Sequence, residues 1–219
     1  MLTDTSSVNK SYRQFKGHEM SKTIVLASGN KGKIREFSQI LSGFHLEIVP
    51  QTQFNVPEAA ETGLSFVENA ILKARNAAKH TELAAVADDS GIEVDALKGA
   101  PGIYSARFAG ENASDEENLQ LLLEKIKTIP DEARTARFQC VIAYVRHDND
   151  PMPRIFQGTW EGYILHEAKG ANGFGYDPIF YVPTHECASA ELDPMIKNQL
   201  SHRGQALRAF HSALEMHKI

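Results

Sequence analysis

The sequence has little cysteine and no excess of positive charge, and it has no long apolar run. Only Cys140 and Cys187 occur in 219 residues, so we expect a reducing, cytoplasmic location and no disulfide framework. No apolar segment approaches the length of a membrane span, and we expect no membrane partner. The 23 basic side chains are outnumbered by 28 acidic ones, which argues against a nucleic-acid binder because such proteins carry a basic excess.

Other absences narrow the class of enzyme. The sequence contains no internal repeat, no Cys/His spacing typical of zinc sites and no Gly-x-Ser-x-Gly motif, so zinc enzymes and serine hydrolases are unsupported. The length favours one α/β domain with room for a second lobe. Residues 1–19 are polar and lead to a second methionine, Met20. We therefore expect residues 1–20 to be a flexible extension and residues 21–219 to be the folded domain.

The most informative stretch is Ala87-Asp88-Asp89-Ser90-Gly91. It follows the apolar run Leu83-Ala84-Ala85-Val86, which is typical of a short buried strand. Adjacent carboxylates at the end of such a strand suit Mg²⁺, which prefers hard oxygen ligands. The ligand crevice of open α/β sheets also lies beyond the carboxyl ends of strands. An ordinary turn is the alternative, since the same residue types are common in turns.

A second candidate site follows the first predicted strand, residues 23–27. The motif Ser28-Gly29-Asn30-Lys31-Gly32-Lys33 comes next, and apolar residues then recur at helical spacing over residues 34–41. A strand, a glycine-containing loop and a helix in this order aim backbone N–H groups at an anion. The motif matches neither the P-loop nor the dinucleotide fingerprint. An anion-binding loop and an ordinary βα turn both remain open.

Polar side chains also recur along the next predicted helix. Ser65 and Glu68 form a capping-box pattern that begins it. Asn69, Lys73 and Asn76 then fall on one face, at spacings of four and three. Such a stripe is either a solvated face or the wall of a phosphate cleft.

The second half of the chain predicts a hairpin, a glycine-rich loop and a closing helix. Residues 136–145 and 155–165 are typical of two strands joined by a turn. Glycines beside Phe174 and Tyr176 would let a flat base approach and stack, although a surface loop with buried aromatics is equally consistent. His202 and Arg203 precede the last helix and offer hydrogen-bond donors to carbonyl or phosphate oxygens.

Taken together and in order, these motifs resemble the inosine/xanthosine triphosphate pyrophosphatase family, most closely its bacterial branch. The resemblance extends over about residues 22–216. The motifs that carry it are Ser28-Gly29-Asn30-Lys31-Gly32-Lys33, Glu61-Thr62-Gly63, Glu68-Asn69-Ala70, Ala87-Asp88-Asp89-Ser90-Gly91, Gly99-Ala100-Pro101-Gly102-Ile103-Tyr104-Ser105-Ala106-Arg107, Gly173-Phe174-Gly175-Tyr176-Asp177-Pro178 and Ser201-His202-Arg203.

This resemblance implies an α/β fold that is elongated and two-lobed, with a long central mixed sheet, helices around it and a cleft between the lobes. It implies a homodimeric, cytoplasmic, Mg²⁺-dependent enzyme. The implied reaction converts dITP, ITP, XTP or dXTP to the monophosphate and pyrophosphate, which keeps deaminated purines out of DNA and RNA. The domain expected over residues 21–219 would then be a nucleoside triphosphate pyrophosphatase domain.

The resemblance also assigns roles to individual residues. Asp89 corresponds to the catalytic proton acceptor, and Asp89 and Glu61 to metal ligands, with Asp88 expected nearby in the metal shell. The register of Glu61 is open because Glu58 lies in the same loop. The implied nucleotide contacts are Ser28, Gly29, Asn30, Lys31, Gly32, Lys33, Ser90, Phe174, Gly175, Tyr176, Asp177, Lys197, His202 and Arg203. Two alternatives remain open: the same reaction on a modified pyrimidine triphosphate, and a nucleotide sensor without turnover, against which the intact acidic pair argues.

Overall fold

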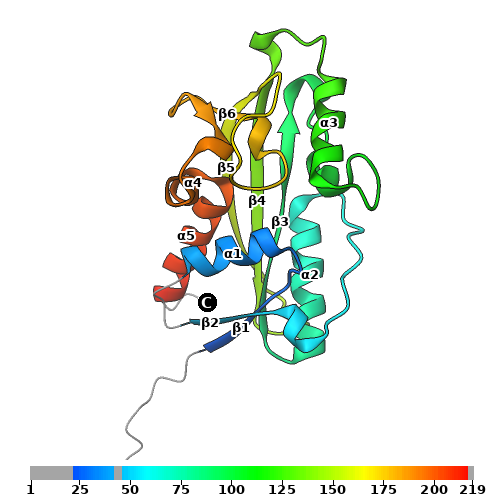
Figure 1. Cartoon of the computed structure of the whole chain (residues 1–219). Helices are drawn as coiled ribbons and strands as arrows, with labels where there is room; N and C mark the ends of the chain where they lie inside the picture. Colours follow the sequence, from blue (N-terminus) through cyan, green and yellow to red (C-terminus); the bar gives the residue numbers. More distant parts are fainter. Residues whose placement is uncertain (1–21, 42–45, 217–219) are drawn as a thin grey trace, which may run out of the picture.

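The computed structural model describes residues 22–41 and 46–216, and its centre is a seven-stranded sheet of order β2-β1-β3-β4-β5-β6-β7 (Figure 1). The predicted extension over residues 1–20 lies outside the described residues. The strands are β1 (Lys22–Leu26), β2 (Leu46–Pro50), β3 (Ala84–Val94), β4 (Thr135–Val145), β5 (Arg154–Ile164), β6 (Phe180–Val182) and β7 (Cys187–Ala188). The α-helices are α1 (Lys31–Ile40), α2 (Phe66–Thr81), α3 (Asp115–Lys125), α4 (Pro194–Leu200) and α5 (His202–Glu215).

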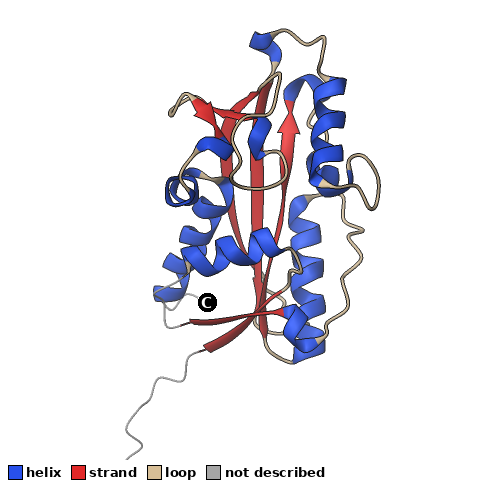
Figure 2. Cartoon of the chain, viewed as in Figure 1, coloured by secondary structure: helices blue, strands red, loops and turns tan. Residues whose placement is uncertain are grey.

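The sheet is mixed, as the family resemblance implied. β1 pairs in parallel with both β2 and β3, and the remaining neighbours from β3 to β7 are antiparallel. Figure 1 shows β3, β4 and β5 running along the length of the molecule, while β1 and β2 lie across one end. Helices lie around the sheet (Figure 2). The α/β class and the long mixed sheet are therefore confirmed, and the two-lobed arrangement stays a prediction.

The acidic motif lies inside β3, and the prediction that the strand ends before it was wrong. The motif continues in register with β4, from Asp88 opposite Ile142 to Gly91 opposite Gln139. This antiparallel ladder supplies backbone partners beyond the apolar run, which is why polar residues can continue the strand. The strand that ends here is β1: its last pair with β3 is Leu26–Val86. The crevice expected at a carboxyl end is therefore that of β1, with β3 passing beneath it.

Alternation along β3 divides the motif between the two faces of the sheet. Val86 lies in an apolar cluster with Phe37 of α1 and Phe210 of α5. Its neighbours Ala85 and Ala87 lie in a second cluster with the alanines of α2. Asp88 therefore continues the α1/α5 face, and Asp89 continues the α2 face.

Two features of composition have clear counterparts in the structure. Both cysteines are free thiols, and burial raises the pKa of Cys140 to about 12, so this thiol stays protonated at neutral pH. Trp160 is buried and packs against Phe138 and Phe180. No helix in the described part of the chain is long and apolar enough to cross a bilayer.

The start of α5 is held against β5 by a glycine. A Cβ atom on Gly158 would lie 2.0 Å from the carbonyl oxygen of His202. Only a residue without a side chain lets this helix start approach the strand so closely.

We predict that Gly158→Ala lowers the free energy of unfolding by about 1–3 kcal/mol, because the added methyl group overpacks a backbone contact. Urea unfolding measures this. Gly29→Ala is the matched control, since its Cβ would find its nearest neighbour at an ordinary 3.5 Å. Equal unfolding midpoints for the two variants would contradict the prediction.

Candidate active site

Asp88 is held between two cations on the α1/α5 face of β3. Arg203 donates from Nε and Nη2 to its Oδ2 atom at 3.1 and 2.9 Å, and the Nζ atom of Lys33 lies 3.2 Å from Oδ1. Burial alone would raise the pKa of Asp88, but the charges of Lys33 and Arg203 outweigh it and hold the pKa far below its usual range. Asp88 is therefore a buried anion that orients these two cations.

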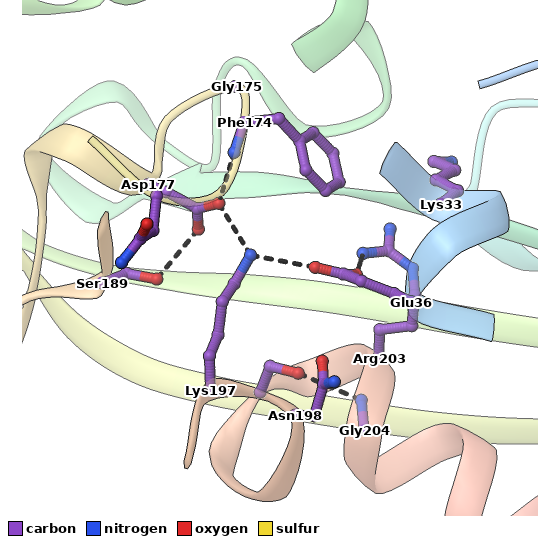
Figure 3. Close-up of polar contacts among 12 residues, drawn as sticks. Lys33, Glu36, Phe174, Gly175, Asp177, Ser189, Lys197, Asn198, Arg203 and Gly204 are labelled. Atoms are coloured by element: carbon purple, nitrogen blue, oxygen red, sulfur yellow. Dashed lines mark hydrogen bonds and ion pairs between the residues drawn. The ribbon is translucent and has the colours of Figure 1, made fainter. Parts of the chain in front are cut away.

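Glu36 of α1 extends this arrangement toward the glycine-rich loop (Figure 3). It accepts hydrogen bonds from Arg203 and, at 2.9 Å, from Lys197, which also donates to Asp177 at 2.7 Å. Burial would raise the pKa of Glu36, but Arg203 and Lys197 together lower it. The result is a buried charge network in which signs alternate along Asp177, Lys197, Glu36, Arg203, Asp88 and Lys33.

The glycine-rich loop is shaped by Asp177. Its carboxylate accepts from the N–H of Phe174 at 2.8 Å and from the hydroxyl of Ser189 at 2.9 Å. The ring of Phe174 lies over the cations of the network, 5.1 Å from the Nζ atom of Lys197 and 5.7 Å from the guanidinium carbon of Arg203. Figure 3 shows the ring projecting from the loop toward α1. An aromatic face fixed in this way is suited to stacking on a flat base.

The ring of Phe174 forms one wall of an aromatic pocket, whose other walls include Phe138, Tyr176 and His202. Tyr176 donates from its hydroxyl to the carbonyl oxygen of Ser105 at 2.8 Å. His202 stacks on Phe138 with ring centroids 4.8 Å apart, and its Nδ1 atom has no hydrogen-bond partner among the described residues. Burial holds the pKa of His202 well below its usual value, so the neutral ring offers one donor and one acceptor.

A charged cleft adjoins the aromatic pocket. Its lining includes Ser28, Gly29, Lys73 and Arg107, and its volume is about 570 Å³. Asn30, Lys33 and Ala106 line both cavities. Asn30 caps α1 by accepting from the N–H of Lys33 at 3.0 Å, so the start of this helix lies at the junction. The two cavities therefore adjoin at the start of α1, with the aromatic pocket on one side and the charged cleft on the other.

On the α2 face of β3, Lys73 joins two carboxylates. Its Nζ atom lies 2.6 Å from Oδ1 of Asp89 and 2.7 Å from Oε1 of Glu61, and Arg107 donates to the other Glu61 oxygen at 2.9 Å. Burial raises the pKa of Asp89, an effect that Lys73 only partly offsets. The pKa of Glu61 is lowered, because Lys73 and Arg107 outweigh its burial. The Oδ2 atom of Asp89 is buried without a hydrogen-bond partner among the described residues.

This pair of carboxylates fits a magnesium ion that arrives with phosphate. In residues 22–41 and 46–216 no group of three or more His, Cys, Asp or Glu side chains is placed to hold a metal. Mg²⁺ usually needs only one or two carboxylates beside substrate phosphates and water. Asp89 and Glu61 meet this need: both contact the same cation, and Oδ2 of Asp89 has an unused lone pair.

The structure brings most of the predicted contacts together, and three residues, Lys31, Gly32 and Asp88, lie differently from the prediction. Lys31 is exposed on the first turn of α1 and lines neither cavity. Gly32 does not line them either, but it seats Phe174, because a Cβ there would lie 2.8 Å from the Cδ1 atom of that ring. Asp88 lies on the opposite face of β3 from Asp89, so alternation separates two carboxylates that the sequence places side by side.

Glu36 is the functional residue that the sequence analysis missed. It follows Lys33 by three residues, a helical spacing that places both on one face of α1. It also interrupts the apolar stripe of that helix next to Phe37, and it is only 8% exposed. An acidic residue beside the apolar stripe of a helix is the signal in the sequence that could have identified Glu36.

An aromatic pocket that adjoins a cleft lined by both cations and carboxylates is suited to a phosphorylated nucleotide that binds with a metal ion. The comparisons with known proteins agree. Residues 24–213 match the model of the Ham1 family, and the chain belongs to this family.

Several relatives match along nearly their whole length. The dITP/XTP pyrophosphatase of Vibrio parahaemolyticus serotype O3:K6 is 61% identical over 193 residues, 88% of this chain and 96% of the relative. That of Shigella flexneri is 58% identical over 191 residues, 87% of this chain and 97% of the relative. The solved structure of a HAM1 protein from Coxiella burnetii superposes with a TM-score of 0.83 at 52% identity, covering 89% of this chain and 99% of that one.

We predict that Glu36→Gln lowers the free energy of unfolding by about 3–5 kcal/mol at neutral pH, because two buried cations lose their shared anion. The pKa of Glu36 is lowered from 4.5, so the wild-type advantage is present above that pH and is lost as the pH falls through the lowered value. Urea unfolding of both proteins over a pH series measures the difference.

Glu116→Gln is the control, because this exposed residue makes only a local hydrogen bond with Gln120. A Glu36 variant as stable as this control, or a difference that does not shrink in acid, would contradict the prediction.

Proposed function

We propose that this protein hydrolyses deaminated purine nucleoside triphosphates, namely dITP, ITP, XTP and dXTP, to the monophosphate and pyrophosphate. The observation that carries the proposal is the pair Asp89–Glu61, joined by Lys73 at 2.6 and 2.7 Å, beside a pocket that suits a base. Relatives at about 60% identity bear the name dITP/XTP pyrophosphatase. As the resemblance implies, the enzyme uses Mg²⁺, forms a homodimer and acts in the cytoplasm to cleanse the nucleotide pool.

The arrangement of the two cavities sets the direction in which the substrate lies. The purine stacks on Phe174 in the aromatic pocket, and the triphosphate extends into the charged cleft. Lys33 lies at the junction and lines both cavities. It is therefore placed to neutralise the phosphate nearest the sugar, while Lys73 and Arg107, which line only the charged cleft, are placed to neutralise the phosphates beyond it.

Cleavage between the α and β phosphates depends mainly on positioning and on charge neutralisation. The Oδ2 atom of Asp89 accepts a proton from the attacking water, and the raised pKa of this buried carboxyl makes it a stronger base than an exposed aspartate. Lys73 holds the Oδ1 atom of the same carboxylate and so fixes its orientation. When bound between Asp89 and Glu61, Mg²⁺ would supply further neutralisation of the phosphate charge.

Selectivity for a 6-oxo purine follows from the donors that face the base. Hypoxanthine and xanthine carry a carbonyl acceptor where adenine carries an amino donor. Arg203 is already engaged by Asp88, Glu36 and Ser90, so it acts by fixing the pocket. The neutral ring of His202 is left to donate its N–H to the 6-oxo group.

We predict fast pyrophosphate release from dITP and XTP, little release from dATP, which lacks the 6-oxo acceptor, and loss of all release in the presence of a chelator; dGTP is measured beside them because guanine shares the 6-oxo group. Asp89→Asn removes the base while preserving shape, and general-base catalysis contributes about 10²–10⁴-fold to a rate. The variant should therefore lose activity by about that factor, with pyrophosphate release measured enzymatically.

Two outcomes would contradict the proposal. Tight dITP binding without turnover by the wild-type protein would indicate a nucleotide sensor. Equal rates on all four nucleotides, or a preference for a modified pyrimidine triphosphate, would show that the pocket does not select a deaminated purine.

A further inference from the structure

Glu61 lies on an irregular segment, the acidic loop, residues 55–64. This loop is neither helix nor strand, and its backbone hydrogen bonds include one from Val56 to Gln51 at its start and one from Thr62 to Ala60 near its end. If the carboxylate of Glu61 is to stay close to Asp89, the loop needs contacts beyond its own few backbone hydrogen bonds. Those contacts come from α2.

Two asparagines of α2 bind the backbone of the acidic loop on either side of Glu61. Asn76 donates from Nδ2 to the carbonyl oxygen of Pro57 at 2.7 Å. Asn69 accepts at Oδ1 from the N–H of Gly63 at 2.8 Å. The loop therefore runs antiparallel to the helix, and it is held both before and after Glu61.

All three residues of the polar stripe, Asn69, Lys73 and Asn76, therefore contact the acidic loop. Lys73 lies between the two asparagines on the same face of α2 and contacts the side chain of Glu61 at 2.7 Å. The outer two members bind backbone and the middle member binds carboxylate. The stripe is therefore not a solvated face: its two asparagines bind the acidic loop, and its lysine both contacts Glu61 and lines the charged cleft.

Asn69 shows features that stability alone does not explain. It is completely buried, yet its Nδ2 atom has no hydrogen-bond partner among the described residues. An unpaired buried donor destabilises the folded protein, because it has lost its hydrogen bonds with water and gained none in return. The loop also approaches so closely that a Cβ on Gly63 would lie 2.8 Å from Oδ1 of Asn69 and 2.6 Å from Cβ of Glu68. The hydrogen bond from Gly63 to Asn69 thus requires both a buried amide with one unpaired group and a residue without a side chain.

We propose that Asn69 and Asn76 are positioning residues that hold Glu61 opposite Asp89. This inference rests on the proposed function, in which these two carboxylates act together. The phosphates of a bound nucleotide compete with Glu61 for the charge of Lys73. The hydrogen bonds between the Asn69 and Asn76 side chains and the loop backbone involve only neutral groups. Phosphate charge therefore does not compete for them directly, and they hold the acidic loop in place while Lys73 is shared.

Asn76→Ala and Asn69→Ala test the proposal in the full-length protein. We expect kcat for dITP to fall about 10–100-fold, as for other residues that support a metal ligand, and KM to change little, because the aromatic pocket is untouched. In the nucleotide-free protein, hydrogen exchange over residues 57–64 should become faster, most of all at Gly63 in Asn69→Ala. Asn76→Gln, which keeps the donor, should recover part of the activity.

Arg75→Met is the matched control. Arg75 also donates from α2 to a backbone carbonyl, that of Asp150 at 3.0 Å, but on the other side from the acidic loop. The Arg75→Met variant should leave kcat and the hydrogen exchange of residues 57–64 unchanged, even if it lowers stability as much as the two alanine variants do.

Unchanged exchange over residues 57–64 in both alanine variants would overturn the proposal, and so would an equal fall of kcat in Arg75→Met. A fall of kcat without recovery in Asn76→Gln and without faster exchange would also overturn it. If the wild-type protein does not hydrolyse dITP, the proposed function fails, whereas the exchange data still decide whether the asparagines position Glu61.

Discussion

The ion pairs of Arg203 with Asp88 and Glu36 are the interaction on which the site depends. They bring the start of α5, the middle of β3 and the first turns of α1 into one buried cluster. Each cation and anion in this cluster is buried, so removing one partner would leave an uncompensated charge. Arg203 also lies beneath the ring of Phe174, which forms a wall of the aromatic pocket. Asp88 pairs with Lys33, which lies where the two cavities adjoin. Base binding and phosphate binding therefore share one rigid support.

The alternation of side chains along β3 gives the two adjacent aspartates different roles: Asp88 supports the buried ion pairs, and Asp89 is the proposed catalytic residue. Asp88 faces α1 and α5, where Lys33 and Arg203 neutralise it and lower its pKa, and Asp89 faces α2, where burial raises its pKa. Adjacent residues of one strand thus have opposite electrostatic environments, because neighbouring side chains point to opposite faces. β1 ends at Leu26, and the residues that follow it, 27–30, line the charged cleft together with Asp88.

The sequence was informative where a local pattern decides the structure. The hairpin of β4 and β5 and the helix that begins after Ser65 follow from periodicity and capping, whereas the mixed sheet was implied by the family resemblance. The end of β3 was misplaced because only long-range pairing with β4 shows that a polar segment continues the strand. Glu36 was missed for the same reason: its partners Lys197 and Arg203 lie more than 150 residues away, at separations of 161 and 167. The two faces of the acidic pair became evident only once the motif was known to lie within a strand.

The central claim is that one site holds the base against Phe174 and presents the α phosphate to Asp89. The most direct measurement is a crystal structure with Mg²⁺ and a dITP analogue whose α–β bridging oxygen is replaced by an imido group. The account predicts hypoxanthine in the aromatic pocket, its 6-oxo group facing His202, and the triphosphate passing Lys33 so that the α phosphorus faces Asp89. A nucleotide lying in the opposite direction, with its phosphates among the aromatic residues, would contradict it.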